Sequence, residues 1–340
     1  MCSDRLRGAA AQRRSLLAGI AALACTRARA ADDAARVAAA RREGGLVLYA
    51  SMPQDEMQAL ADGFGERFGL KVSVWRAGSE RILQRVLAET RAGRQAADVV
   101  ETNSPELEAL AAADAFSRLE SPQLESVIDG ALPSHRLWVG TRVNLIVQAV
   151  NTRLVADHEM PRGWEDLADG RWRDRLAVEA NADDWYGTLT DAMGGARGRA
   201  LFAGIAQRNG MSARKGHSLL TQLVAAGEGP LALTVYAYRV HQLVRAGAPL
   251  RAVALAPPVG RVNGLGVLRG AHSPNAARLF VDYMLGDAQR ELARNGHLPA
   301  RRDAALAMPP DLRMVDPAAS ASTRERWASD FADMLARGRR

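Results

Sequence analysis

The chain has 340 residues, of which 48% are hydrophobic and 24% are charged, with 30 Gly and 14 Pro. This balance is typical of a globular protein of one large or two average domains, and it excludes collagen, low-complexity disorder and a disulfide scaffold. The net charge is +7, but residues 1–30 contribute +5 of it with six Arg and one Asp, so the remainder carries only +2. Because nucleic-acid binding needs clustered Lys and Arg with interleaved aromatic residues, we expect no nucleic-acid partner.

Residues 1–30 have the pattern of an export signal. The pair Arg13-Arg14 precedes an apolar run from Leu16 to Cys25, which is shorter than the ~20 residues of a permanent bilayer span. Ala28-Arg29-Ala30 follows, with small residues at the two positions that a signal peptidase reads. We therefore expect export to the periplasm with cleavage near Ala30. The arginine pair also matches a twin-arginine signal, but a Sec-type leader stays open because the chain has 43 Arg and only two Lys.

Both cysteines, Cys2 and Cys25, lie inside this leader. The mature chain is therefore expected to contain no disulfide, thiolate metal site or cysteine nucleophile. The residues Ala22-Leu23-Ala24-Cys25 could be a lipoprotein attachment site, but Ala22 stands where Leu is usual and the site at 28–30 fits better. We expect a soluble periplasmic protein.

Short strands alternate with helices in the first part of the chain. Continuous apolar runs of strand length indicate strands buried on both faces, and apolar residues at helical spacing follow each of them. Repeated strand–helix units of this length predict a parallel sheet covered by helices. The predicted strands are 46–50, 71–75 and 98–101, and the predicted helices are 55–68, 79–90 and 104–113.

A long apolar stretch at 137–150 predicts a strand that leaves this first lobe. The pattern then resumes with strands at 176–178, 230–235, 251–255 and 265–268 and helices at 184–193, 199–208, 218–226, 236–246 and 275–285. Near the end, Trp327, Phe331 and Leu335 fall at positions i, i+4 and i+8. This stripe predicts a helix that docks onto the first lobe.

The usual enzyme motifs are missing. The string nearest to a G-x-S-x-G elbow, at 216–220, lacks the second Gly and is more typical of a helix start. The six His are scattered without H-x-x-x-H, so we expect each to be a surface or capping residue. The Gly264-Leu265-Gly266 string is a weak dinucleotide signal, and there is no Walker A string. We expect no enzymatic activity, and no motif identifies a certain cofactor. The alternative is an exported enzyme that uses Asp183 or His241 as a base.

Small polar residues follow each predicted strand of the first lobe. They are Ser51 after the first strand, Gly78 and Ser79 after the second, and Asn103 after the third. Free backbone N–H groups and the helix dipole at such positions favour an anion or a polar ligand. Ser79 and Ser104 could instead be ordinary N-caps. Three such positions on one sheet edge favour a ligand site.

Two polar and aromatic clusters stand at strand-to-helix junctions in the second half. The first offers a carboxylate, an indole and a phenol, and the second holds two of the five tyrosines. The residues are Asp183, Trp185 and Tyr186, and Tyr236, Tyr238 and Arg239. The two tyrosines at i and i+2 share a face if the strand continues and diverge by ~200° in a helix. One phenol could pack in the core, but we expect at least one to face a cleft.

A series of strings along the chain resembles the periplasmic extracellular solute-binding proteins of ABC importers, in the branch that contains the ferric-ion-binding proteins. Each string is loose by itself, but their order and spacing are specific, and they span nearly all of residues 43–303. They read GLVLYAS (45–51), ADVVETN (97–103), VNT (150–152), PRGWEDL (161–167), GEGPLA (227–232), HSPNAARLF (272–280) and MLGDAQ (284–289).

This resemblance implies an α/β fold of the two-lobe, type II-like periplasmic-binding-protein class. Each lobe is expected to be a mixed, mostly parallel sheet flanked by helices, with crossover strands between the lobes. Lobe 1 is expected to comprise 31–140 plus 257–340, and lobe 2 to comprise 141–256. A monomer would close by hinge motion on a ligand in the cleft and release it to the permease subunits of the importer.

The resemblance also bears on the ligand. In that family two adjacent tyrosines coordinate ferric iron, whereas here Tyr236 and Tyr238 are separated by Ala237. Hard oxygen ligands for Fe(III) could come from these tyrosines with Asp183 and Asp184. Alternatively, a small organic or phosphorylated anion would be held by polar residues and an arginine fork. The residues expected around such an anion are Ser51, Ser79, Asn103 and Asn263, with Arg142 or Arg239.

Overall fold

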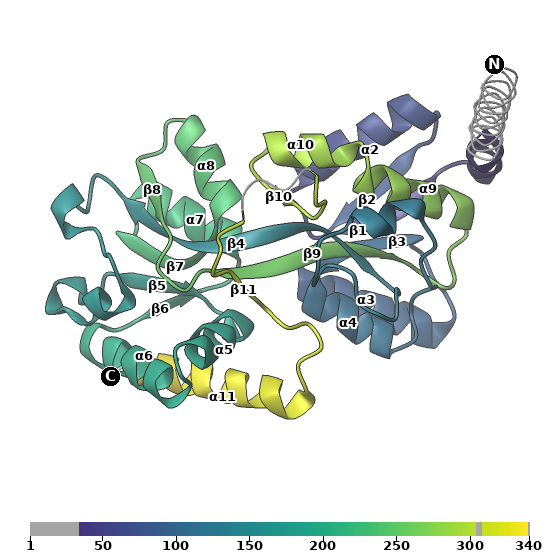
Figure 1. Cartoon of the computed structure of the whole chain (residues 1–340). Coiled ribbons are helices and arrows are strands. Elements are labelled where there is room, and N and C mark those ends of the chain that lie inside the picture. Colours follow the sequence, from purple (N-terminus) through teal and green to yellow (C-terminus); the bar gives the residue numbers. More distant parts are fainter. Residues whose placement is uncertain (1–33, 304–307, 339–340) are drawn as a thin grey trace, which may run out of the picture.

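The computed structural model describes residues 34–303 and 308–338, so the predicted export signal and both cysteines lie outside the described residues. A mixed sheet runs through two lobes in the order β2-β1-β3-β9-β4-β7-β5-β6, with β8 and β10 on β4 and β11 on β9 (Figure 1). The strands are β1 (Leu46–Ala50), β2 (Val72–Arg76), β3 (Val99–Asn103), β4 (Val139–Asn151), β5 (Leu176–Glu179), β6 (Ser212–Arg214), β7 (Leu231–Tyr236), β8 (Leu250–Val253), β9 (Val259–Val267), β10 (Leu298–Pro299) and β11 (Arg313–Met314).

The first lobe is built on the parallel strands β1, β2 and β3. Their apolar side chains are covered by helices α2 (Gln54–Phe68), α3 (Ser79–Ala92), α4 (Ser104–Ala112), α9 (Pro274–Leu285) and α10 (Ala288–Arg294). Phe64 on α2 meets Phe280 on α9 edge to face, with ring centroids 5.2 Å apart. This pair joins the N-terminal segment to a helix more than two hundred residues later in the chain, so the first lobe is discontinuous in sequence.

The second lobe repeats the arrangement with β5 parallel to both β6 and β7. Its helices are α5 (Asp183–Ala192), α6 (Ala196–Asn209), α7 (His217–Ala226) and α8 (Ala237–Arg245). Short 3-10 turns at Pro122–Ser126, Asp157–Glu159, Trp164–Ala168 and Gly170–Trp172 complete the connections. Trp164, Trp185 and Phe202 pack together as the aromatic centre of this lobe. The predicted two-lobe α/β fold is confirmed.

Two long antiparallel strands, β4 and β9, carry the chain between the lobes (Figure 1). Their register pairs Val139 with Leu265 at one end and Ile146 with Val259 at the other. Both strands are almost completely buried along their length. The crossing strand predicted at 137–150 is therefore confirmed. The strand predicted at 265–268 begins six residues earlier, because Arg261 and Asn263 are buried polar residues inside it.

The C-terminal helix α11 (Ala321–Arg337) packs against α5 and α6 of the second lobe. The prediction that its apolar stripe docks onto the first lobe is wrong. The reason lies upstream, where β11 pairs with β9 between the lobes and directs the chain across to the second lobe. Phe331 and Leu335 then join the second-lobe core. Residues 321–337 thus contribute to the second lobe, and the other predicted lobe boundaries stay a prediction. None of the described helices is both long and apolar enough to cross a membrane.

Candidate functional site

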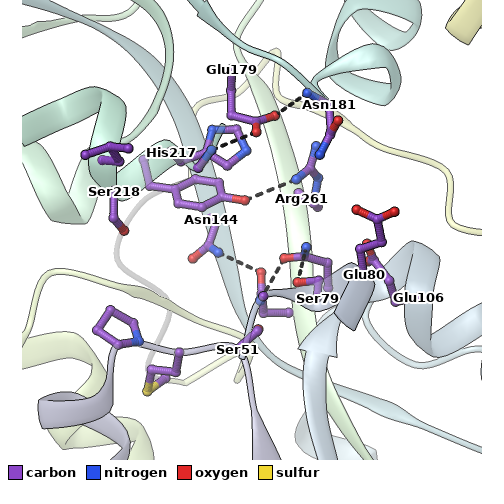
Figure 2. A pocket seen from close by; sticks show the side chains of 18 of the residues that line it. Ser51, Ser79, Glu80, Glu106, Asn144, Glu179, Asn181, His217, Ser218 and Arg261 are labelled. Carbon is purple, nitrogen blue, oxygen red and sulfur yellow. Dashed lines mark hydrogen bonds between the residues drawn. The ribbon is translucent and has the colours of Figure 1, made fainter. Parts of the chain in front are cut away.

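A cavity of about 590 Å³ lies between the two lobes at the ends of the buried strands. Figure 2 shows Glu179, Asn181, His217 and Arg261 along one wall, with Ser51 and Ser79 along the opposite wall. We call it the ligand cavity. Eight of the twelve predicted site residues line it, namely Ser51, Gly78, Ser79, Asn103, Arg142, Tyr236, Tyr238 and Asn263.

The loop after β1 is held by a buried carboxylate. Glu101, fully buried on β3, accepts hydrogen bonds from the backbone amides of Ser51 and Met52, both at 3.0 Å. Its other oxygen lies 2.8 Å from Nη2 of Arg142, whose side chain is only 2% exposed. These two amides therefore donate within the protein and are not available to a ligand. The expectation that the backbone at Ser51 is free for a ligand is wrong, because Glu101 already fills that position.

A chain of side-chain amides links the crossover strands to the first lobe. Nδ2 of Asn144 donates to Asn263 at 2.6 Å, Asn263 donates to Asn103 at 3.0 Å, and Asn103 donates to Oγ of Ser79 at 2.7 Å. Because Ser79 accepts the last hydrogen bond, its own hydroxyl proton is free to be donated into the ligand cavity. Neither Ser79 nor Ser104 is an N-cap as we had considered, since each is the first residue of its helix.

Two buried arginines lie against the ligand cavity. Arg261, on β9, donates to the hydroxyl of Tyr236 at 3.1 Å and pairs with Asp184. Burial alone would lower the pKa of Arg261, but the charges of Asp184, Tyr236 and Glu106 outweigh it and raise that pKa, so the guanidinium stays charged. Among the described residues, Nε of Arg261 and both Nε and Nη1 of Arg142 have no hydrogen-bond partner. A ligand with acceptor oxygens would satisfy these donors.

Four rings stack in a column along one side of the cavity. His217 lies 4.4 Å from Tyr236, Tyr236 lies 5.9 Å from Tyr238 with nearly parallel planes, and Tyr238 lies 4.1 Å from His297. Both tyrosines line the cavity. Burial raises the pKa of both phenols, although Arg261 opposes the shift at Tyr236.

The two histidines of this column are not the surface or capping residues that we expected. Burial, helped by the charge of Arg261, lowers the pKa of His217 to about 4, and Nδ1 of its neutral ring donates to the carbonyl of Thr234 at 2.9 Å. His297 is 1% exposed and lies 2.6 Å from Glu56. Burial also lowers the pKa of His297, although the bond to Glu56 opposes it.

Three carboxylates that the sequence did not point to complete the cavity wall, namely Glu80, Glu106 and Glu179. Glu179, at the end of β5, accepts from the amide of Asn181 at 2.6 Å and from that of Gly216 at 2.9 Å, which fixes the start of α7. Glu106, in the first turn of α4, is half-buried. Burial raises the pKa of Glu106 to about 7, although Arg261 opposes the shift. Other lining residues that the sequence did not point to are Arg76, Arg81, Asn144, Lys215, Ser218 and Arg261.

Four predicted site residues do not line the ligand cavity. Trp185 and Tyr186 lie in the second-lobe core, because the helix that starts at Asp183 turns both rings toward Phe202. Arg239 donates to Gln242 on the next turn of α8. Asp183 lines a smaller neighbouring cavity. The assignment of the two aromatic residues and Arg239 to this site is corrected accordingly.

The residues predicted as oxygen ligands for iron are not gathered in one place. Tyr236 and Tyr238 line the ligand cavity, whereas Asp183 and Asp184 line the neighbouring one and Asp184 is paired with Arg261. Among the described residues, no group of three or more His, Cys, Asp or Glu side chains is placed to hold a metal ion.

This chain is similar in sequence and in fold to known proteins. A family model described as bacterial extracellular solute-binding protein matches residues 46–297. The Fe(3+)-binding periplasmic protein of Serratia marcescens is 24% identical over 268 residues, covering 76% of this chain and 79% of that protein. Iron-bound HitA from Pseudomonas aeruginosa has a TM-score of 0.70 at 21% identity, covering 86% of this chain and 99% of that one. AfuA from Actinobacillus pleuropneumoniae, solved with exogenous fructose-6-phosphate, has a TM-score of 0.72 at 18% identity and the same coverage.

Proposed function

This chain belongs to the family of bacterial extracellular solute-binding proteins, and we propose that it binds a small organic or phosphorylated anion between its lobes and delivers it to the permease of an ABC importer. The resemblance identified from the sequence is thereby confirmed at the level of the family. The pair Arg142 and Arg261 is the observation that carries the choice of an anion. Both residues line the cavity, their side chains are nearly fully buried, and each guanidinium has nitrogens without a hydrogen-bond partner among the described residues.

An anion fits these donors for an energetic reason. A buried donor without a partner costs about 1–3 kcal/mol, and more when the donor is charged, so a bound oxyanion that accepts from these guanidinium groups would be stabilised. The planar arginine fork matches the geometry of a carboxylate or phosphate. The hydroxyl of Ser79 supplies a further donor from the opposite wall, so closure of the lobes would bring donors from both sides onto one ligand.

Ferric iron is the second candidate, because Tyr236 and Tyr238 face the ligand cavity and two of the similar proteins bind iron by name. The arrangement here is less suited to it. The hydroxyl of Tyr236 already accepts a hydrogen bond from Arg261, and burial raises the pKa of both phenols. An iron site would need both phenols deprotonated in the presence of a buried guanidinium that also lines the cavity.

A visible absorption spectrum separates the two candidates. Ferric citrate is added to the purified mature chain and to the variant Tyr236→Phe with Tyr238→Phe. We expect no charge-transfer band in either protein. A band in the wild type that disappears in the double variant would establish tyrosinate-bound iron and overturn the anion assignment. In parallel, phosphate monoesters and carboxylates are tested by thermal shift against the wild type and Arg261→Met, which should lose the response.

The remaining features of the transport role are proposals that rest on the family. We propose export by a cleaved leader at residues 1–30, by the twin-arginine or the Sec route, and function as a periplasmic monomer without catalytic turnover. N-terminal sequencing of protein from the periplasm tests cleavage near Ala30. The alternative of an exported enzyme would require turnover in a metabolite screen that Asp183→Ala or His241→Ala abolishes.

A further inference from the structure

A second cavity adjoins the ligand cavity on the side of the C-terminal segment. It has a volume of about 330 Å³, and four of its lining residues, Glu80, Glu106, Asn181 and Arg261, also line the ligand cavity. Figure 2 shows Glu80 and Glu106 on the side of the ligand cavity where Arg261 lies. A ligand bound to Arg261 in the first cavity therefore lies within reach of the second, which we call the acidic cavity.

The two cavities have opposite charge. Cationic side chains outnumber carboxylates in the ligand cavity, where Arg76, Arg81, Arg142, Lys215 and Arg261 face Glu80, Glu106 and Glu179. The acidic cavity reverses this balance, since Glu80, Glu106, Asp183, Asp184 and Asp316 face only Arg261 and Arg324. Asp184 is neutralised by its pair with Arg261, and Arg324 donates to the backbone carbonyl of Ala319.

Unpartnered polar atoms remain at the border. Oε2 of Glu106 is buried and accepts no hydrogen bond from a described residue, and Nε of Arg261, on a side chain only 6% exposed, donates to none. One atom lacks a donor and the other lacks an acceptor, which is the pattern expected where a ligand carries both signs of charge.

Crowding of carboxylates supports the same conclusion. Burial raises the pKa of Asp183, and the neighbouring charge of Asp184 adds to the shift. Burial likewise raises the pKa of Glu106 to about 7, with Asp184 adding to the shift and Arg261 and Asn103 opposing it. A positive group placed between Glu106 and Asp183 would favour the ionised form of both.

The carboxylates of the acidic cavity are too dispersed for a metal ion, since no described group of three or more His, Cys, Asp or Glu side chains is placed to hold one. An organic ammonium or guanidinium group can instead donate to separate carboxylates. We propose that the ligand is an anion that also carries a cationic organic group. Its acidic end binds Arg142 and Arg261 in the ligand cavity, and its cationic end lies in the acidic cavity near Glu106 and Asp183. This proposal rests on the proposed function.

Matched pairs of small anions that differ only by a terminal ammonium group test the proposal by calorimetric titration. Suitable pairs are ethyl phosphate with O-phosphoethanolamine, propionate with β-alanine, and butyrate with 4-aminobutyrate. In at least one pair the amino compound should bind about tenfold more tightly or better, which corresponds to one or more charge-assisted hydrogen bonds. The variant Asp183→Asn, which changes a carboxylate that lines only the acidic cavity, should reduce this preference several-fold while still binding the anion that lacks the amino group.

The control variant is Asp62→Asn, which removes an exposed carboxylate on α2 far from both cavities and should keep the full preference. Asn is isosteric with the neutral acid at position 183, so Asp183→Asn is expected to fold, and its binding of the plain anion verifies this. If both members of every bound pair bind equally, the proposal that the ligand carries a cationic group is wrong, and the proposed function stays intact. If none of the compounds binds, both the proposed anionic ligand and its proposed cationic group are wrong.

Discussion

Replacing Glu106 by Gln should make the chain more stable at alkaline pH and remove part of the pH dependence of its stability. Glu106 is half-buried at the border of both cavities, and burial raises its pKa from 4.5 to about 7 against the attraction of Arg261. The folded chain therefore holds this proton more tightly than the unfolded chain does. Its stabilising contribution is fully present below pH 4.5 and is lost as the pH rises through about 7.

The size of the effect follows from this difference in pKa. With 1.36 kcal/mol for each pKa unit, ionising Glu106 destabilises the folded chain by about 3 kcal/mol at pH 8 and by about 1 kcal/mol at pH 5. Gln cannot ionise, so it removes both costs. The variant should therefore gain about 2 kcal/mol more stability over the wild type at pH 8 than at pH 5.

Urea denaturation of the wild type and Glu106→Gln at pH 5 and pH 8 measures this difference. Histidines and other groups that titrate in this range contribute equally to both proteins and cancel. The matched control is Glu66→Gln, an exposed residue of α2, which should give the same stability difference at both pH values. A gain for Glu106→Gln that is the same at pH 5 and pH 8 would refute the reasoning, because it would show that Glu106 ionises in the folded chain as readily as in the unfolded one.

Three substitutions test the packing around the site by urea denaturation. Gly187→Ala would place a Cβ 2.1 Å from the ring of Trp327, so it should lower the free energy of unfolding by about 1–3 kcal/mol or more and change the tryptophan fluorescence. An unchanged stability would contradict the tight contact of α5 with α11. Arg142→Met leaves the carboxylate of Glu101 buried and unpaired, which should lower the free energy of unfolding by about 3–5 kcal/mol. If the ion pair is responsible, adding Glu101→Gln should recover most of that loss. Asp98→Ala removes the acceptor of two backbone amides and should cost about 2 kcal/mol or more, whereas a loss below about 0.5 kcal/mol would show that water replaces it.

Strands made of continuous apolar runs could be predicted almost residue by residue. The run LVLYA is strand β1 with the predicted bounds, and the helix predicted at 55–68 differs from α2 by one residue. Such elements are recognisable because the local sequence alone determines both the period and the burial. The ligand-cavity residues Ser79 and Asn103 were found for a related reason, since they follow strands whose ends must meet at one edge of the sheet.

Elements that depend on distant partners were predicted poorly. The apolar stripe of Phe331 and Leu335 indicates that a helix docks, but the surface it meets is decided by the pairing of β11 with β9. In the same way, Trp185 and Tyr186 are polar-tipped aromatic residues after a strand, which fits a site as well as a core. Their place in the core depends on Phe202, which lies on the next helix and makes no local signal.

Arg261 shows most clearly why sequence reasoning stopped short of the full site. It is the third residue of β9, where a charged residue breaks the apolar pattern, and it lies outside the strand predicted at 265–268. Its burial is tolerable only because two residues from other elements compensate for it. Asp184 neutralises the charge, and the hydroxyl of Tyr236 accepts a hydrogen bond from the guanidinium. A buried arginine whose guanidinium has partners for only some of its N–H groups is stable enough to be retained in the fold. Its set of hydrogen-bond partners is nevertheless incomplete. That incompleteness, invisible in the sequence, is the reason why we propose that the strand between the lobes contacts the ligand.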